Sequence, residues 1–261
     1  MKTLATHRRH PAALLVVILV GLLLTGASYA VANSVTQARS AEENATQIDA
    51  GKRLFLEGCS SCHGTAAQGT DNAPSLIGVG SASVDFQMST GRMPLANPAP
   101  QAPAKKPDYN ETEIAAIAAY IASLAPGPAI PSSEDLNYTD ANSAVGGQLF
   151  RANCSQCHQA AGMGGALSNG AFAPNLMEAT PEEIYEAMLT GPQNMPVFSD
   201  ATMPAKDKQQ IIAYIQTLKN GESQGGWALG GFGPVTEGLF AWIGGIMLAL
   251  ACAIWIGAKV R

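Results

Sequence analysis

Two five-residue segments contain most of the side chains that could bind a metal ion or a cofactor. They are Cys59-Ser60-Ser61-Cys62-His63 and Cys154-Ser155-Gln156-Cys157-His158. In a C-x-x-C-H segment, two thiols on one helical turn can form thioether bonds to the vinyl groups of a haem, and the adjacent histidine can bind the iron. The segments therefore predict two covalently bound haem c groups. The expected thioether residues are Cys59, Cys62, Cys154 and Cys157, and the expected proximal iron ligands are His63 and His158.

A C-x-x-C pair can also be half of a zinc site or a thiol–disulfide redox pair. Each zinc site would need two further ligands nearby, but the chain has only five cysteines and four histidines. Those outside the two segments are Cys252, in an apolar C-terminal stretch, and His7 and His10, in the N-terminal tail. One zinc site formed by all four motif cysteines stays open as an alternative, but it would leave His63 and His158 without a role.

Methionine is the expected residue type at the second axial position of each iron, because outside the tail there is no third histidine. Met93 and Met195 each precede a proline in a glycine-bearing loop, where the backbone is free to place a thioether over the iron. We therefore predict them as iron ligands. Met88 and Met203 are the alternatives, although Met88 has the spacing of a core residue in a helix and Met203 precedes the expected start of the last helix. Two protein ligands would leave the iron no open site for a substrate, as in electron-transfer cytochromes.

The residues around the two motifs recur in the same order, which predicts a duplicated domain. Ala73-Pro74-Ser75-Leu76 matches Ala173-Pro174-Asn175-Leu176, and Thr90-Gly91 matches Thr190-Gly191. We place the two domains at residues 46–125 and 144–220, with a linker at 126–143.

Apolar residues at helical spacing predict that both domains are mainly α-helical. Longer helices are expected over Thr112–Leu124 and Asp207–Leu218, and no alternating strand pattern of useful length occurs. Short helices over Ala50–Gly58 and Gly147–Asn153 should lead into the motifs. Thr180 and Pro181 have the residue types of a helix N-cap and first helical residue. The stretch Pro94–Pro107 contains five prolines and should form an extended loop within the first domain.

Apolar stretches near both ends predict attachment to a membrane. Residues 11–32 follow a basic tail (1–10) and form either a cleaved signal peptide or, as we slightly favour, a retained signal anchor. Residues 239–258 contain no charge and have Trp242 and Trp255 near their ends, which is typical of a transmembrane helix. A juxtamembrane loop (221–238) precedes it. The basic residues at both ends place the termini in the cytoplasm and the haem domains on the outer face of the cell membrane.

The charge balance excludes one class of partner. Between Asn33 and Gly238 the chain has ten Lys/Arg residues and all twenty of its Asp/Glu residues. Nucleic-acid binding requires a basic surface, so this acidic middle argues against it.

Over nearly its full length the chain resembles the dihaem cytochrome c subunit of the actinobacterial cytochrome bcc complex, a menaquinol–cytochrome c reductase. Besides the tandem motifs, the resemblance rests on the four segments PSLIGVG (74–80), STGRMP (89–94), LTGPQNMP (189–196) and LGGFGP (229–234). One departure is Ala201-Thr202-Met203-Pro204, where a plainer helix start is expected.

The resemblance implies two tandem cytochrome c domains of class I type and a role as an electron relay without catalytic acids or bases. Electrons would come from menaquinol, oxidised in the cytochrome b subunit, through the Rieske iron–sulfur subunit, and would leave to a haem-copper cytochrome oxidase. It also implies that the carbonyls of Pro74 and Pro174 accept hydrogen bonds from the proximal imidazoles; alternatively, these prolines only turn the loop. The functional alternatives are a free-standing membrane-anchored dihaem carrier and a peroxidase-type haem enzyme.

Overall fold

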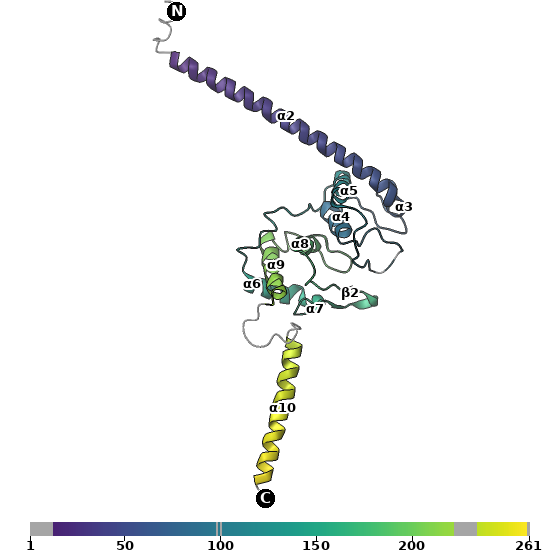
Figure 1. Ribbon diagram of the computed structural model, residues 1–261. Helices are drawn as coiled ribbons and strands as arrows, with labels where there is room; N and C mark the ends of the chain where they lie inside the picture. Colours follow the sequence, from purple (N-terminus) through teal and green to yellow (C-terminus); the bar gives the residue numbers. More distant parts are fainter. Residues whose placement is uncertain (1–12, 98, 100, 222–233, 260–261) are drawn as a thin grey trace, which may run out of the picture.

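The computed structural model describes residues 13–97, 99, 101–221 and 234–259. Two helical units lie between two long apolar helices (Figure 1). The fold is mainly α-helical, as predicted. The first unit comprises the end of α2 (Ala13–Gly58), α3 (Ser60–His63), α4 (Gly80–Ser89) and α5 (Glu111–Leu124). The second comprises α6 (Ser143–Asn153), α7 (Ser155–His158), β1 (Gly165–Ala166), the 3-10 turn η1 (Ser168–Gly170), β2 (Phe172–Ala173), α8 (Pro181–Thr190) and α9 (Ala205–Lys219), and α10 (Pro234–Lys259) follows it.

Helix α2 is much longer than the sequence suggested. The short helix expected over Ala50–Gly58 is the C-terminal end of one helix that begins at Ala13. Between Gly26 and Gly51 the chain contains neither glycine nor proline, so nothing in that stretch breaks the helix. Two stretches of the described residues are long and apolar enough to cross a membrane, Leu14–Ser34 in α2 and Val235–Ala258 in α10.

The same helix crossing occurs in both units and depends on a glycine. A Cβ atom on Gly51 would lie 1.9 Å from the carbonyl oxygen of Ala116, where α2 crosses α5. A Cβ atom on Gly146 would lie 1.8 Å from the carbonyl oxygen of Gln210, where α6 crosses α9. No side chain fits at such distances, which explains why glycine stands at both positions of the repeat.

An aromatic pair beside each crossing shows that the duplication extends to side-chain packing. The rings of Phe55 and Tyr120 lie 5.4 Å apart at an interplanar angle of 50°. Those of Phe150 and Tyr214 have the same separation and angle. Tilted rings at this distance have favourable quadrupole interactions in addition to the burial of apolar area.

Helices α4 and α8 are the second equivalent pair, and they pack against each other across the two units. The predicted start of α8 is confirmed: Thr180 is the N-cap, Pro181 is in the first turn, and Glu183 completes a capping box. The predicted core position of Met88 in α4 is also confirmed, because the residue is buried, as is Met188 in α8.

The linker between the units is packed against both of them. The carbonyl of Pro128 accepts a hydrogen bond from the backbone N–H of Ala82 in α4, at 3.1 Å. Farther along, the carbonyl of Glu134 accepts one from the Gln209 side chain in α9, at 2.9 Å. The linker therefore fixes the first unit to the second through hydrogen bonds near its start and at its middle.

Candidate functional site

Each C-x-x-C-H motif forms a short helix that directly follows a longer one, α3 after α2 and α7 after α6. The backbone N–H of His63 donates to the carbonyl of Cys59 at 3.0 Å, and that of His158 donates to the carbonyl of Cys154 at 2.9 Å. One helical turn thus contains both thiols and the imidazole, as covalent haem attachment requires.

Both imidazoles are oriented by the proline carbonyls named above. Nδ1 of His63 lies 2.8 Å from the carbonyl oxygen of Pro74. Nδ1 of His158 lies 3.0 Å from the carbonyl oxygen of Pro174. A carbonyl only accepts, so Nδ1 carries the proton in each ring and Nε2 is left as the basic nitrogen that can bind a metal. The expected contacts are therefore present in both units.

Two glycines that sequence reasoning missed bring the prolines to the histidines. Gly69 and Gly164 have φ angles of +85° and +79°, and their backbone N–H groups donate to the carbonyls of His63 and His158. A Cβ atom on Gly69 would lie 2.5 Å from the backbone nitrogen of Ser75, so the chain approaches too closely for any side chain. The two glycines are 95 residues apart, the same spacing as the two motifs, and this spacing could have revealed them.

A cavity of about 670 Å³ opens beside the second motif. This volume is within the range of about 300–1,000 Å³ typical of small-molecule and cofactor sites. Apolar side chains such as Leu176, Ile211 and Ile215 contribute to its walls. The predicted second-site residues Cys154, Cys157, His158 and Met195 all line it. Two thiols, an imidazole and a thioether around one largely apolar cavity fit a covalently attached haem.

The first unit closes part of this cavity. The Gln101 side chain donates to the carbonyl of Phe172 at 2.7 Å and accepts from the N–H of the same residue at 2.8 Å. The carbonyl of Ala102 accepts a hydrogen bond from the Gln193 side chain at 3.3 Å. Residues 101–105 of the proline-rich loop line the cavity, so this loop, expected to lie within the first domain, forms part of the second site.

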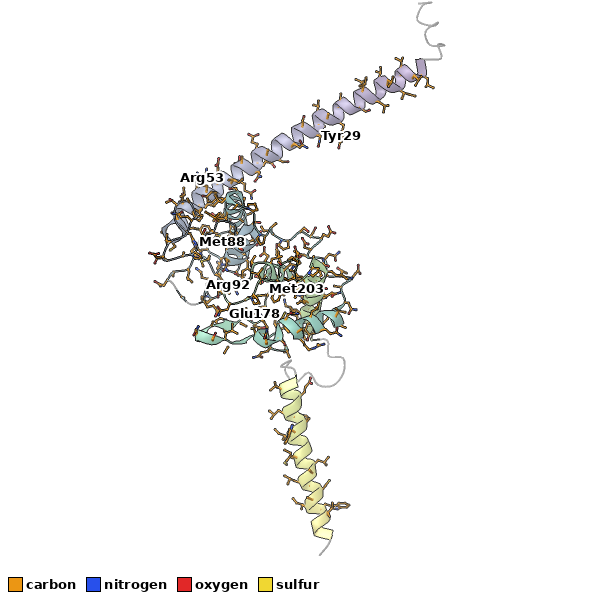
Figure 2. The ribbon with its side chains drawn as sticks, turned by 180° about the vertical axis from the view of Figure 1, so that it is seen from behind. Tyr29, Arg53, Met88, Arg92, Glu178 and Met203 are labelled. Atoms are coloured by element: carbon orange, nitrogen blue, oxygen red, sulfur yellow. The ribbon has the colours of Figure 1, made fainter. Side chains whose placement is uncertain are left out.

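The four candidate methionines differ in burial. Met93 and Met195 are half-buried in loops, and Met93 packs on the same core as Cys59. Met88 and Met203, in contrast, are each only 5 % exposed and belong to the two cores (Figure 2). The latter pair therefore has a packing role in these units.

The thiols do not have the properties of reactive cysteines. Burial raises the pKa of the Cys154 thiol to about 11, and the neighbouring Cys157 contributes in the same direction. Burial also raises the pKa of Cys59. Redox-active C-x-x-C pairs have a lowered thiol pKa, so this environment argues against a thiol–disulfide catalyst. Burial lowers the pKa of His158 despite its bond to Pro174, which favours the neutral imidazole that a metal requires.

Two protein families match the chain, one for each unit. The family described as cytochrome c matches residues 48–125. The family described as cytochrome C oxidase, cbb3-type, subunit III matches residues 141–215.

Individual relatives match almost the whole chain. The cytochrome bc1 complex cytochrome c subunit of Corynebacterium diphtheriae is 47 % identical over 255 residues, which cover 90 % of each protein. The protein of the same name from Mycobacterium bovis is 44 % identical over 251 residues, covering 94 % of this chain and 90 % of the relative. That from Corynebacterium efficiens is 47 % identical over 227 residues, covering 81 % of this chain and 77 % of the relative.

Proposed function

The chain belongs to the family of cytochrome c subunits of the actinobacterial cytochrome bc1 complex, and we propose that it relays electrons from the Rieske iron–sulfur subunit to a haem-copper oxidase. It has two cytochrome c domains and hence two covalently attached haem c groups. When bound, each haem c supplies an iron that takes up and releases a single electron. The sections of chain around it determine how that iron is held and what can reach it.

We assign each haem to one motif and one methionine loop. The observation that supports this most directly is at the second site, where the cavity lined by Met195 also contains His158, whose Nδ1 bonds to Pro174. The first set is Cys59 and Cys62 as thioether residues with His63 and Met93 as iron ligands, and the second is Cys154 and Cys157 with His158 and Met195.

In this arrangement the protein groups position the iron ligands and surround the haem. None of them is assigned a role in proton chemistry. The proline carbonyls fix the imidazole planes and increase the basicity of Nε2. The thioethers of Met93 and Met195 would bind the iron together with the imidazoles, and methionine as a ligand would favour the reduced form of the iron. Apolar side chains such as Leu176, Ile211 and Ile215 would lower the polarity around the haem at the second site. These features match a carrier of single electrons that binds no substrate at its metal.

The direction of the relay follows from the proposed partners. Electrons would enter the first unit from the Rieske subunit, which receives them from menaquinol oxidation in the cytochrome b subunit. They would leave the second unit to the oxidase. The family and the two apolar helices support a membrane location. We propose that the haem domains face the outside of the cell, because the basic residues at the chain ends favour the cytoplasmic side.

Affinity purification of the tagged full chain in mild detergent tests the proposal. We expect the cytochrome b subunit, the Rieske subunit and oxidase subunits to copurify, and menaquinol to reduce both haems in the purified assembly. Fully haem-loaded chain recovered without a cytochrome b and Rieske subunit would instead identify a free-standing carrier and overturn the proposal.

A further inference from the structure

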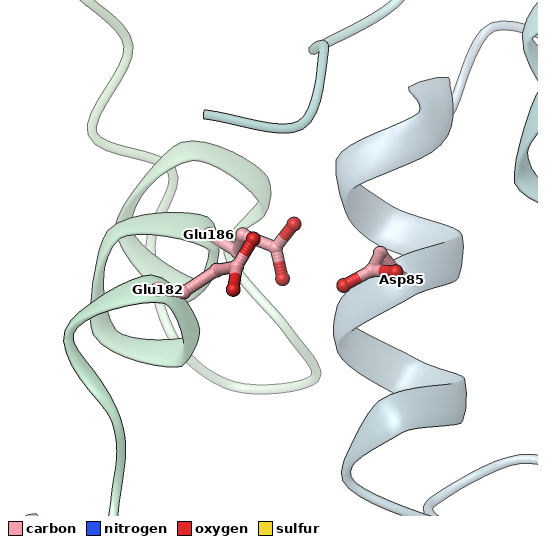
Figure 3. Close-up of side chains that lie close together, drawn as sticks. All are labelled: Asp85, Glu182 and Glu186. Atoms are coloured by element: carbon pink, nitrogen blue, oxygen red, sulfur yellow. The ribbon is translucent and has the colours of Figure 1, made fainter. Parts of the chain in front are cut away.

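Three carboxyl groups meet where the two haem domains touch. Asp85 comes from α4 of the first unit, and Glu182 and Glu186 come from α8 of the second. One oxygen of each lies within 4.8 Å of the others. Glu182 and Glu186 are four residues apart on one helix and therefore share a face. Figure 3 shows both of their carboxyl groups directed across the interface toward Asp85.

The central carboxyl group is buried without any partner. Glu186 is 0 % exposed, and neither of its carboxyl oxygens has a hydrogen-bond donor. The ion pairs found among the described residues lie elsewhere, at Lys105–Asp108 and Lys208–Asp200. A buried carboxylate without a cation or hydrogen-bond donor is strongly disfavoured, so such a group calls for an ion or a proton that completes it.

The charged groups that shift the pKa values of Glu186 and Asp85 are all acidic. Burial, and then the charges of Asp85, Glu182 and Glu183, raise the pKa of the Glu186 carboxyl to about 9. Burial, and then Glu182 and Glu111, raise the pKa of Asp85. A buried group of like charges is stabilised either by a proton held on one carboxyl group or by a cation that compensates the charge of all three.

We propose that Asp85, Glu182 and Glu186 bind a Ca²⁺ ion between the two haem domains. All three offer only carboxylate oxygen, the ligand of hard cations, and the cluster contains no nitrogen or sulfur ligand that would favour zinc, copper or iron. Ca²⁺ accepts six to eight oxygens in flexible geometry, with carboxylates binding through one or both oxygens. Asp85 is only partly buried and Glu182 is exposed, so water can complete the coordination.

An ion at this position would join α4 to α8 beside the second haem site. Asp85 and Glu186 adjoin Phe86 and Ala187 in sequence, and these two residues line the cavity of the second site. An ion held from both helices therefore clamps α4 against α8 at the wall of that cavity. Because each helix belongs to a different domain, the clamp fixes the two haem domains relative to each other.

The test uses the full-length dihaem protein in detergent, stripped with EDTA and then freed of chelator. Isothermal titration with CaCl₂ should show one ion per chain with a Kd of about 10⁻⁵ to 10⁻⁴ M, at least tenfold tighter than MgCl₂. CaCl₂ should also raise the melting temperature. Glu186→Gln and Glu182→Gln should each weaken Ca²⁺ binding at least tenfold, whereas Glu43→Gln, a loss of the same charge from the exposed part of α2, should leave it unchanged.

Three results would overturn the proposal: no Ca²⁺ binding by the stripped protein, undiminished binding by the cluster variants, or MgCl₂ binding as tightly as CaCl₂. If the stripped protein binds no Ca²⁺ and the Glu186→Gln variant is more stable than the parent at neutral pH, the carboxyl groups share a proton instead. The haem absorption spectrum checks that each variant folds. Because Glu182 is exposed, Glu182→Gln keeps the test valid if Glu186→Gln does not fold.

Discussion

At the scale of single residues, the two proximal histidines have the same hydrogen bond but different surroundings. Both imidazoles donate to a proline carbonyl. His158 is only 8 % exposed and lines a cavity to which both units contribute, whereas His63 is half-buried. Low polarity around a haem disfavours the ferric form, which has one more positive charge than the ferrous form.

We therefore expect the two haem c groups to titrate at different potentials, with the second site higher by at least about 60 mV, a tenfold difference in the one-electron equilibrium constant. Spectroelectrochemical titration of the full-length protein would show two waves, and a Met195→His variant would assign them because only the upper wave should shift downward. A shift of the lower wave in that variant would reverse the assignment.

The proposed iron ligands predict how each iron reacts when its methionine is removed. Reduced native protein should not bind carbon monoxide, because both axial positions are filled. Met93→Ala and Met195→Ala should each open one iron, so that carbon monoxide binds to about half of the haem. The measurement is the absorption change of the reduced protein under carbon monoxide.

The core methionines provide the matched controls for this experiment. Met88→Leu and Met203→Leu change residues that are equally buried in the two cores, at a cost below about 1.5 kcal/mol. They should leave carbon monoxide binding absent. Carbon monoxide binding by Met88→Leu, with none by Met93→Ala, would transfer the ligand role to Met88.

At the scale of elements, local sequence signals were sufficient for several helices and for one cap. The Thr180-Pro181 start of α8 was predictable because a cap depends on residues within one turn. The contact between Gln101 and Phe172 was not predictable, because the two residues are 71 positions apart in the chain. A hydrogen bond from a side chain to a distant backbone group also leaves no periodic pattern in the sequence. The length of α2 was also missed, since a polar stretch without glycine or proline is compatible with either helix or linker.

The proline-rich loop should control access to the second site through Gln101. Gln101→Ala removes two hydrogen bonds to the backbone of Phe172, each contributing about 1 kcal/mol. We expect faster hydrogen exchange in β2 and a lower potential at the second haem, with the first haem unaffected. The control is Gln148→Ala, an exposed glutamine of α6. Unchanged exchange in β2 would show that the loop is held by its prolines and not by Gln101.

At the scale of the whole molecule, three separate contacts join the two haem domains. The linker bonds to α4 through Pro128 and to α9 through Glu134, the proline-rich loop bonds to β2 through Gln101, and the carboxyl cluster lies between α4 and α8. The duplication was visible in the sequence because each copy repeats its own core. The interface was not visible in the sequence, because the residues that form it differ between the copies. Asp85 of α4 and Glu182 of α8, for example, do not occupy equivalent positions in the repeat.

The carboxyl cluster makes the stability of this interface depend on pH. The pKa of Glu186 is raised from 4.5 in the unfolded chain to about 9, chiefly by burial. The folded state therefore holds a proton that the unfolded state has released between these pH values, so its contribution to stability is complete below about pH 4.5 and is lost as the pH rises through 9. The pKa of Asp85 is raised as well, by burial and then by Glu182 and Glu111, and a cation near these groups, Arg92, interacts with Glu183.

In calcium-free buffer, the melting temperature of the native protein should therefore fall between pH 6 and pH 9, and that of Glu186→Gln should fall less, by a difference on the order of 5 °C. Saturating CaCl₂ should flatten the native profile, because the ion replaces the proton as the partner of the carboxylate. Scanning calorimetry of both proteins across this range measures the difference directly. Parallel profiles for the two proteins would show that Glu186 releases its proton at an ordinary pKa, and that some other contact balances its burial.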